Sequence, residues 1–254
     1  MIDSPHLHIN DWGIRPTLFQ IGSFPIPSYS VFVLLGMFVA IIVFALFTRR
    51  QNQWHEHSFY ILISGLVGGA LGAKIPIWIV YYREIISSFP DLSVLLSGRT
   101  IVGGLIGGTF AVWAMKKKLG IKRRIGNAIA PAASLGIAIG RIGCFLRGCC
   151  YGKQTNLAWG VDFGDGIFRH PTQIYESIFC LILFFYFLWA LKKPQKDGVL
   201  FRQFMVLYLI FRFLVEFIRV EPQILWGLTG FQYAALLIVV YYIARTFFPS
   251  IYGK

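Results

Sequence analysis

Charged residues are scarce in this sequence of 254 residues, and acidic residues are the scarcest of them. Aspartate and glutamate together number 11 against 24 lysines and arginines, and charged residues make up only 14% of the chain. An average soluble domain has about 25% charged residues. With 56% hydrophobic residues and a mean hydropathy of +0.64, the composition argues against an ordinary soluble domain and favours a membrane protein.

Several common catalytic motifs are also missing. There is no glycine-rich loop followed by Lys-Ser/Thr, no His-Glu-x-x-His and no serine-centred nucleophile elbow, which argues against P-loop enzymes, metalloproteases of that motif and α/β-hydrolases. A basic, cleavable signal peptide is not evident either, because the first 30 residues are polar and carry one basic residue, Arg15. The first apolar run is therefore expected to stay as a transmembrane helix.

Seven apolar runs divide the chain. They are Tyr29–Thr48, Phe59–Tyr81, Ile101–Met115, Ile125–Leu146, Thr172–Leu191, Phe204–Val220 and Phe231–Phe248. A helix needs about 20 residues to cross the hydrocarbon core of a bilayer, and most of the runs reach that length. We therefore expect an all-α, polytopic membrane protein with about seven transmembrane helices, forming a single domain over residues 1–254.

Basic residues are distributed unevenly between the loops that join these runs. Arg49 and Arg50, most residues of 116–124 and four in 192–202 lie in one alternate set of flanks, whereas the other set has few. By the positive-inside rule the basic set is cytoplasmic, so the N-terminus is outside and the C-terminus inside. Residues 1–28 then form an outer-face segment and 147–171 an outer loop. The basic excess fits anionic membrane lipids as partners and gives no support for nucleic acid.

Glycines recur at helical spacing in three of the runs. They are Gly65, Gly68, Gly69 and Gly72; Gly103, Gly104, Gly107 and Gly108; and Gly136 with Gly140. Small residues four apart let membrane helices approach closely. For Gly103 and Gly104 packing alone is the stronger interpretation, with substrate binding as the alternative. Lys74, within the second run, is expected to face the protein interior.

Charged residues inside apolar runs are the candidates for a functional site. Arg141 interrupts one run, and Arg212, Glu216 and Arg219 fall at i, i+4 and i+7 of another. This spacing predicts one helix face. Two arginines with one glutamate leave a positive site, which favours a phosphate over a purely structural pair.

Two further segments supply polar residues near the expected outer surface. The sequence His170-Pro171-Thr172-Gln173-Ile174-Tyr175-Glu176 opens the fifth run. Thr172 is expected to cap the helix, with Gln173 and Glu176 on adjacent faces. Tyr29 opens the first run, where it is either an interfacial anchor or a substrate contact.

Three of the four cysteines, Cys144, Cys149 and Cys150, lie within seven residues. Three interpretations stay open: packed thiols, a disulfide of Cys144 with one of the other two, or a soft metal ion bound together with His170. No C-x-x-C pair supports the metal, so we expect no metal and no cofactor. Cys180 lies in mid-run, where a packing role is expected.

In combination these motifs resemble the bacterial prolipoprotein diacylglyceryl transferase family. The matching segments, in order, are Tyr29, Gly103–Gly107, Gly140–Gly143, His170–Glu176 and Phe211–Arg219. The resemblance covers most of the chain. It implies a multi-pass protein of the bacterial inner membrane that moves diacylglyceryl from phosphatidylglycerol to a cysteine thiol in a prolipoprotein signal peptide, with release of glycerol phosphate.

The resemblance also implies roles for residues. Arg141, Arg212 and Glu216 are expected to be catalytic together with His170, the arginines holding the phosphate. Substrate-binding residues are expected to be Tyr29, Lys74, Gly103, Gly104, Gln173, Glu176 and Arg219. The sequence departs from the family pattern at Val102, where a histidine is usual, at Lys74, where an arginine is expected, and at Cys144, where an asparagine is usual. The alternative function is a non-catalytic phospholipid-binding membrane protein that retains the phosphate site.

Overall fold

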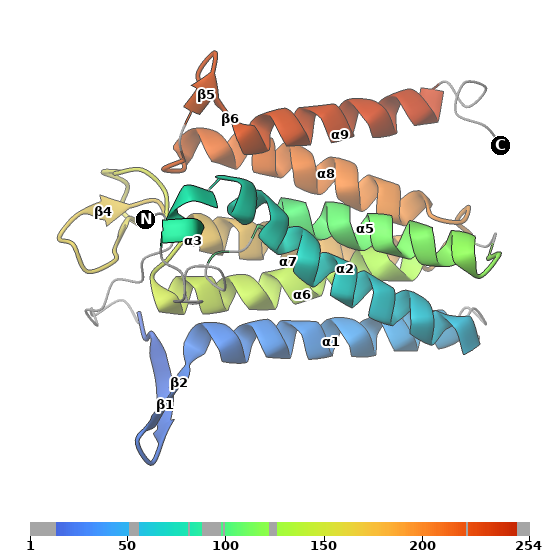
Figure 1. The fold of residues 1–254 in the computed structure, drawn as a ribbon, viewed down its shortest axis with the longest axis horizontal. Helices are drawn as coiled ribbons and strands as arrows, with labels where there is room; N and C mark the ends of the chain where they lie inside the picture. Colours follow the sequence, from blue (N-terminus) through green and yellow to red (C-terminus); the bar gives the residue numbers. More distant parts are fainter. Residues whose placement is uncertain are drawn as a thin grey trace. The chain divides into compact units, whose positions relative to one another are not determined.

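The structure, a computed structural model, describes residues 14–50, 56–80, 82–87, 98, 100–121, 126–221 and 223–247. It is mostly helical (Figure 1). The helices are α1 (Ser28–Arg50), α2 (Glu56–Val80), α3 (Tyr82–Ser87), α5 (Ile101–Lys118), α6 (Gly126–Arg147), α7 (Thr172–Ala190), α8 (Val199–Val215), the short 3-10 helix η1 (Glu216–Ile218) and α9 (Gly230–Phe247). Antiparallel hairpins are formed by β1 (Thr17–Ile21) with β2 (Phe24–Pro27), β3 (Val161–Asp162) with β4 (Phe168–Arg169), and β5 (Gln223–Leu225) with β6 (Leu228–Thr229).

Each of the seven apolar runs overlaps a helix, so the helical part of the all-α prediction is confirmed, whereas the three β-hairpins were not predicted. Within the described ranges, four helices are long and apolar enough to cross a membrane: α1, residues His57–Ile79 of α2, α6 and α7. In α9 the apolar part, Gly230–Ala244, is shorter. The count of seven spans and their orientation stay predictions.

Helix α1 shows why lipid is the natural surrounding of this fold. Its side chains are apolar on every side, and Leu34 and Phe38 are 65% and 62% exposed. A helix that is hydrophobic all round must be buried either in protein or in a membrane. Because the described residues cover only a small part of α1, lipid is the surrounding that fits the rest.

The chain divides into two compact units, residues 52–123 and the remainder. Within the unit 52–123, α2 and α5 pack closely through their glycines. A Cβ atom on Gly72 would lie 2.5 Å from the carbonyl oxygen of Gly103, and one on Gly68 would lie 2.7 Å from that of Gly107. Only glycine fits at such distances, so the predicted glycine faces are confirmed for these helices. The prediction of a single domain over the whole chain remains a prediction.

In the other unit, α1 packs against α6 through a second glycine contact. A Cβ atom on Gly36 would lie 2.6 Å from the carbonyl oxygen of Gly136. Gly136 therefore has the packing role that its spacing predicts. Gly140 does not share it, because a Cβ atom there would meet nothing within 4 Å.

Helix α8 ends earlier than the sequence predicts. The apolar run extends to Val220, but the α-helix stops at Val215, and Arg219 is extended with φ −89° and ψ 159°. The backbone of this segment pairs instead with the loop 147–171, the predicted outer loop: Lys153 N donates to Ile218 O at 2.7 Å, and Gly152 forms a bridge to Arg219. These bonds replace helical ones. The prediction of a shared helix face is therefore wrong for Arg219, whereas Arg212 and Glu216 keep the i,i+4 relationship and form an ion pair of 3.0 Å.

The loop after α6 is a folded element with an apolar core of its own. Strands β3 and β4 form its hairpin, whose turn is closed by backbone N–H groups that donate to the carboxylate of Asp162. Phe163 and Ile14 are fully buried in one cluster, against which Tyr151 packs. The loop is therefore a fixed platform at the end of α6.

Within this unit the hairpins and the basic residues lie at opposite ends of the helices. Figure 1 shows β1–β2, β3–β4 and β5–β6 at one end of α1 and α6–α9. Arg49 and Arg50, in the last turn of α1, and Lys192 and Lys193, after α7, lie at the other end. This separation agrees with the charge asymmetry of the sequence.

Candidate functional site

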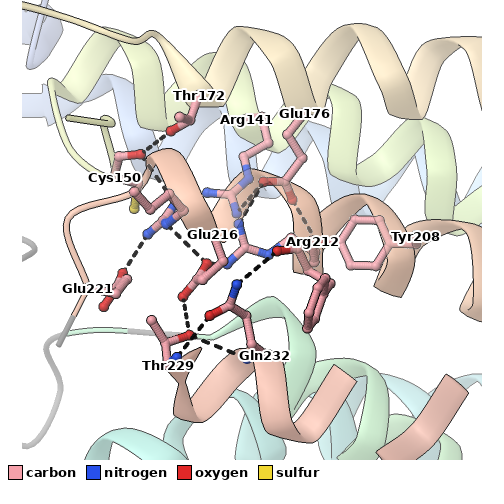
Figure 2. A network of polar contacts seen from close by, with 12 residues as sticks. Arg141, Cys150, Thr172, Glu176, Tyr208, Arg212, Glu216, Glu221, Thr229 and Gln232 are labelled. Carbon is pink, nitrogen blue, oxygen red and sulfur yellow. Dashed lines mark hydrogen bonds and ion pairs between the residues drawn. The ribbon is translucent and has the colours of Figure 1, made fainter. Parts of the chain in front are cut away.

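Arg141 and Glu176 form the first contact of a buried polar network between α6, α7 and α8 (Figure 2). Arg141 Nη2 lies 2.8 Å from Glu176 Oε2, and the side chains are 7% and 1% exposed. Tyr208, from α8, donates its hydroxyl to the other carboxylate oxygen of Glu176 at 2.6 Å. One carboxylate thus joins three helices. The burial of Arg141, expected from its place inside an apolar run, is confirmed.

Arg212, near the end of α8, connects this carboxylate to a second one. Its Nη1 lies 3.6 Å from Glu176 Oε2, and its Nη2 donates to Glu216 Oε2 at 3.0 Å. Glu216 also accepts a hydrogen bond from the hydroxyl of Thr229 at 3.1 Å and lies 3.6 Å from Nε of Arg219. Glu216 therefore holds two arginines, as the sequence predicts, although by a different backbone path.

Arg219 reaches the outer loop. Its Nη2 donates to Glu221 Oε1 at 2.8 Å, and its Nη1 donates to the carbonyl oxygen of Cys150 at 3.2 Å. The same carbonyl accepts a bond of 2.7 Å from the Thr172 hydroxyl. The prediction that Thr172 caps α7 is therefore wrong: Pro171 occupies the cap position, and Thr172 instead fixes the loop. Burial raises the pKa of Glu221, and the Arg219 guanidinium opposes this shift.

The network balances charge but has an excess of hydrogen-bond donors. Three guanidinium groups face three carboxylates. Of the carboxylates, Glu221 was not among the site residues expected from the sequence. The prediction of a net positive charge is therefore wrong for this network. Four buried nitrogens nevertheless have no hydrogen-bond acceptor among the described residues: Nε of Arg141, Arg212 and Arg219, and Nη1 of Arg212. A buried unsatisfied donor costs about 1–3 kcal/mol, so an oxyanion that accepts these bonds is favoured.

His170 is fixed in a separate polar group of the outer loop. Its Nδ1 lies 3.2 Å from the Tyr175 hydroxyl, which also accepts a bond of 2.8 Å from the indole of Trp159. Among the described residues, the imidazole forms no hydrogen bond, ion pair or ring contact with the three arginines. The catalytic role of His170 stays a prediction.

Tyr29 and Gln173 border the site from two helices. Tyr29, at the start of α1, packs beside Gly143 of α6 and has the guanidinium of Arg147 5.2 Å above its ring. Gln173 is 1% exposed and donates its amide to the carbonyl of Cys149. Both therefore contact the segment that follows Arg141, and their roles in substrate binding stay predictions.

The three clustered cysteines meet in space as well as in sequence. The Sγ atoms of Cys144, Cys149 and Cys150 all lie within 4.8 Å of one another, and Arg141 Nη1 lies 3.8 Å from Cys144 Sγ. None of the three is in a disulfide, so the disulfide interpretation is not realised in the structure. Hydrogen bonds from the other two thiols hold the pKa of Cys150 well below its usual range. Cys180 is fully buried in α7, as a packing role predicts.

Comparison with known proteins supplies the family. Residues 16–248 match the family model described as prolipoprotein diacylglyceryl transferase. The phosphatidylglycerol–prolipoprotein diacylglyceryl transferase of Clostridium tetani is 36% identical over 83% of this chain and 87% of its own length. The chain belongs to the prolipoprotein diacylglyceryl transferase family. The transferase of Bordetella parapertussis is 33% identical over 85% of this chain and 86% of its own length. Transferase 2 of Clostridium perfringens is 30% identical over 89% of this chain and 92% of its own length.

Three expected site residues of this diacylglyceryl transferase lie in the unit 52–123. Gly103 and Gly104 face α2: a Cβ atom on Gly103 would collide with Gly72, and one on Gly104 would lie 3.3 Å from the carbonyl oxygen of Gly69. Helix packing accounts for both glycines. Lys74 is half-buried in α2. Substrate binding by these residues stays a prediction.

Sequence reasoning overlooked part of the transferase network. Tyr208, Thr229 and Gln232 are buried members, and Gln232 accepts from Thr229 N at 2.9 Å and donates to Phe213 O at 3.2 Å. Tyr208 was recognisable, because it precedes Arg212 by four residues and so lies on the same face of α8. Thr229 and Gln232 had no comparable signal, since they reach Glu216 and Phe213 only through the fold.

Proposed function

We propose that this chain transfers the diacylglyceryl group of phosphatidylglycerol to a cysteine thiol of a prolipoprotein, using the arginine network as its phosphate site. Family membership and the names of the relatives, all phosphatidylglycerol–prolipoprotein diacylglyceryl transferases, support the reaction. The observation that carries the assignment of the site is the convergence of Arg141, Arg212 and Arg219. They are buried between apolar helices and have donors left over.

The arginines suit the leaving group of this reaction. The thiolate attacks the glyceryl carbon that bears the phosphate ester, the carbon–oxygen bond breaks, and negative charge develops on the departing glycerol phosphate. Arginine donates several N–H groups in a fixed plane, which matches a phosphate better than a point charge does. Donors fixed before the reaction stabilise the developing charge without reorganising.

The carboxylates act in this proposal as positioning residues. Glu176 holds Arg141 and Arg212, and Glu216 holds Arg212 and lies near Arg219. Each guanidinium therefore keeps its plane in the absence of phosphate. Glu176 in turn is fixed by Tyr208. A carboxylate held by donors on both oxygens has little freedom to turn, so the two arginines that contact it are held in position before substrate binds.

The remaining expected residues are assigned to substrate contacts. Tyr29 and Gln173 are proposed to position the glycerol part of the lipid, next to the loop that Gln173 holds. In the unit 52–123, Lys74, Gly103 and Gly104 are proposed to bind substrate. His170 is the side-chain candidate for accepting the proton of the thiol.

The proposed setting is the bacterial inner membrane with the network toward the outer surface. The separation of basic residues from the hairpins within the larger unit supports this orientation. A prolipoprotein would present the cysteine of its signal peptide at that surface. Phosphatidylglycerol would enter from the surrounding lipid.

A direct assay tests the proposal. The purified chain in phosphatidylglycerol-containing vesicles should transfer labelled diacylglyceryl to a peptide that contains the acceptor cysteine, and the gene should rescue cells depleted of their own transferase. The alternative is a non-catalytic phospholipid-binding protein that retains the same phosphate site. Binding of phosphatidylglycerol without transfer, under conditions where the Clostridium tetani transferase is active, would establish that alternative.

A further inference from the structure

The end of α6 gathers three sulfur atoms that the proposed phosphate site does not use. Cys144 lies in the last turn of α6, and the chain then turns back through Gly148, at φ 72°, and Cys150, at φ 63°. Cys149 N consequently donates to Cys144 O at 3.2 Å. All three Sγ atoms lie within 4.8 Å of one another.

The backbone of this turn is held in an unusual conformation. A positive φ is rare for a residue other than glycine, and a strained residue of this kind persists only where the surrounding structure fixes it. The Cys150 carbonyl accepts bonds from Thr172 and Arg219, and the Cys149 carbonyl accepts one from Gln173. Side chains of the phosphate site and of α7 thus hold the sulfur atoms together.

From this arrangement we infer that Cys144, Cys149 and Cys150 bind a zinc ion whose fourth position takes the thiol of the acceptor peptide. Thiolates select soft cations, and zinc takes such ligands without redox chemistry. Thiolates bound to one zinc ion lie about 3.8 Å apart, given Zn–S distances of about 2.3 Å and tetrahedral angles. The observed separations therefore need only small shifts.

Three ligands from the protein are what distinguishes this site from a structural zinc site. Structural sites are closed by four protein ligands, whereas catalytic sites keep one position open. Among the described residues, the cluster of possible metal ligands consists of the three cysteines alone, without a histidine, aspartate or glutamate. Cys150 is also the least buried of the three, so the open position is accessible from its side.

This inference rests on the proposed function, because the acceptor in that reaction is itself a thiol. Zinc deprotonates a coordinated thiol, so the peptide S–H proton passes to solvent, His170 is not needed as the base, and the sulfur stays as a zinc-bound thiolate. This sulfur forms the new bond to the glyceryl carbon as the carbon–oxygen bond to phosphate breaks. The electron pair of that bond leaves with glycerol phosphate, and no oxidant or reductant is needed.

Arg141 connects the two halves of this reaction. Its Nη1 lies 3.8 Å from Cys144 Sγ, while its Nη2 holds Glu176 at 2.8 Å within the arginine network. The nucleophile and the leaving group would therefore meet at one guanidinium. The zinc ion would also supply a means of thiol activation in a chain that has Val102 where the family usually has a histidine.

Metal binding is tested on the full chain without reference to activity. Purified protein should contain about one zinc ion per chain, and cobalt(II) in its place should show sulfur-to-cobalt charge-transfer absorption. Both signals should be lost in Cys144→Ser, Cys149→Ser and Cys150→Ser, and kept in Cys180→Ala, the matched variant of a buried cysteine outside the cluster. Circular dichroism and gel filtration show that each variant is folded. Wild-type protein that binds neither zinc nor cobalt overturns the inference.

Coordination of the acceptor is tested with two peptides that differ only in Cys or Ser at the acceptor position. The cysteine peptide should change the cobalt spectrum and the serine peptide should not; equal spectra overturn the thiol-binding role. Removal of zinc should abolish transfer and its return should restore it, whereas full transfer by metal-free protein overturns the inference and leaves the proposed function intact. A thiol-dependent cobalt spectrum without transfer in any metal state supports the site and overturns the proposed function.

Discussion

Arg141 of α6 and Glu176 of α7 form an ion pair of 2.8 Å in which both side chains are almost completely buried. Taking two charges out of water costs several kcal/mol for each ion, and their attraction compensates only while both partners are present. The pair therefore ties α6 to α7 at the point where the proposed phosphate site is built. Loss of this pair should therefore lower the stability of the protein more than loss of an exposed ion pair would.

Glu176→Gln should destabilise the protein by about 3–5 kcal/mol, because it leaves Arg141 buried without its carboxylate. Asp165→Asn is the matched control: it breaks the Arg169–Asp165 pair, whose side chains are 18% and 26% exposed, and such pairs contribute about 0–1 kcal/mol. The thermal unfolding midpoint in detergent measures both. Equal midpoints for the two variants would show that Arg141 does not depend on Glu176.

Arg141→Ala and Arg212→Ala should each lower the rate of diacylglyceryl transfer by about 10²–10³, the usual effect of losing one donor to a developing oxyanion. Arg→Lys at either position should also be harmful, since an ammonium group cannot replace the planar donor set. Arg202→Ala, at the opposite end of α8 from Arg212, is the control and should transfer normally. Full activity in both alanine variants would remove these arginines from the reaction.

Gly36→Ala should destabilise the packing of α1 on α6, because its Cβ atom would lie 2.6 Å from the carbonyl oxygen of Gly136. Overpacking of this kind costs about 1–3 kcal/mol. Gly140→Ala, whose Cβ atom would meet nothing within 4 Å, should change stability by less than about 0.5 kcal/mol. Unfolding in detergent compares the two, and a larger effect at Gly140 would contradict the contact.

Reporter fusions test the orientation of the chain. A fusion after Lys118, at the basic end of α5, should report the cytoplasm, and a fusion after Gly152, in the loop that follows α6, should report the exterior. The positive-inside rule gives this expectation. Detection of both reporters on the same side would refute the alternation of spans on which the orientation depends.

His170→Ala should lower transfer by no more than about tenfold if zinc activates the thiol, because the ring is engaged with Tyr175 at 3.2 Å. A general base typically contributes about 10²–10⁴, so a loss in that range, in a folded variant that still binds zinc, would identify His170 as the base. The rate of transfer at saturating peptide is the measurement. Arg169→Ala, a neighbouring loop variant, controls for disturbance of the hairpin.

The amino-acid sequence by itself determined the helices and their order. Long apolar runs form helices in a bilayer because every backbone N–H and C=O must be paired within the segment. The close contact of α2 with α5 followed in the same way from glycines spaced four apart, as Gly68 and Gly72 are. Arg141 and Glu216 were recognisable as site candidates because a charge within such a run is rare and expensive.

Only the tertiary structure decided how these residues meet. Helix α8 ends at Val215 because the segment after it pairs with the outer loop, which no local pattern in Phe204–Val220 reveals. Glu221 balances Arg219 for the same reason. The cysteine cluster is not predictable from its spacing either, since it depends on a positive φ at Cys150 that contacts from Thr172 and Arg219 hold in place. Local sequence fixes which segments become helices, whereas contacts between distant segments decide which side chains share a site.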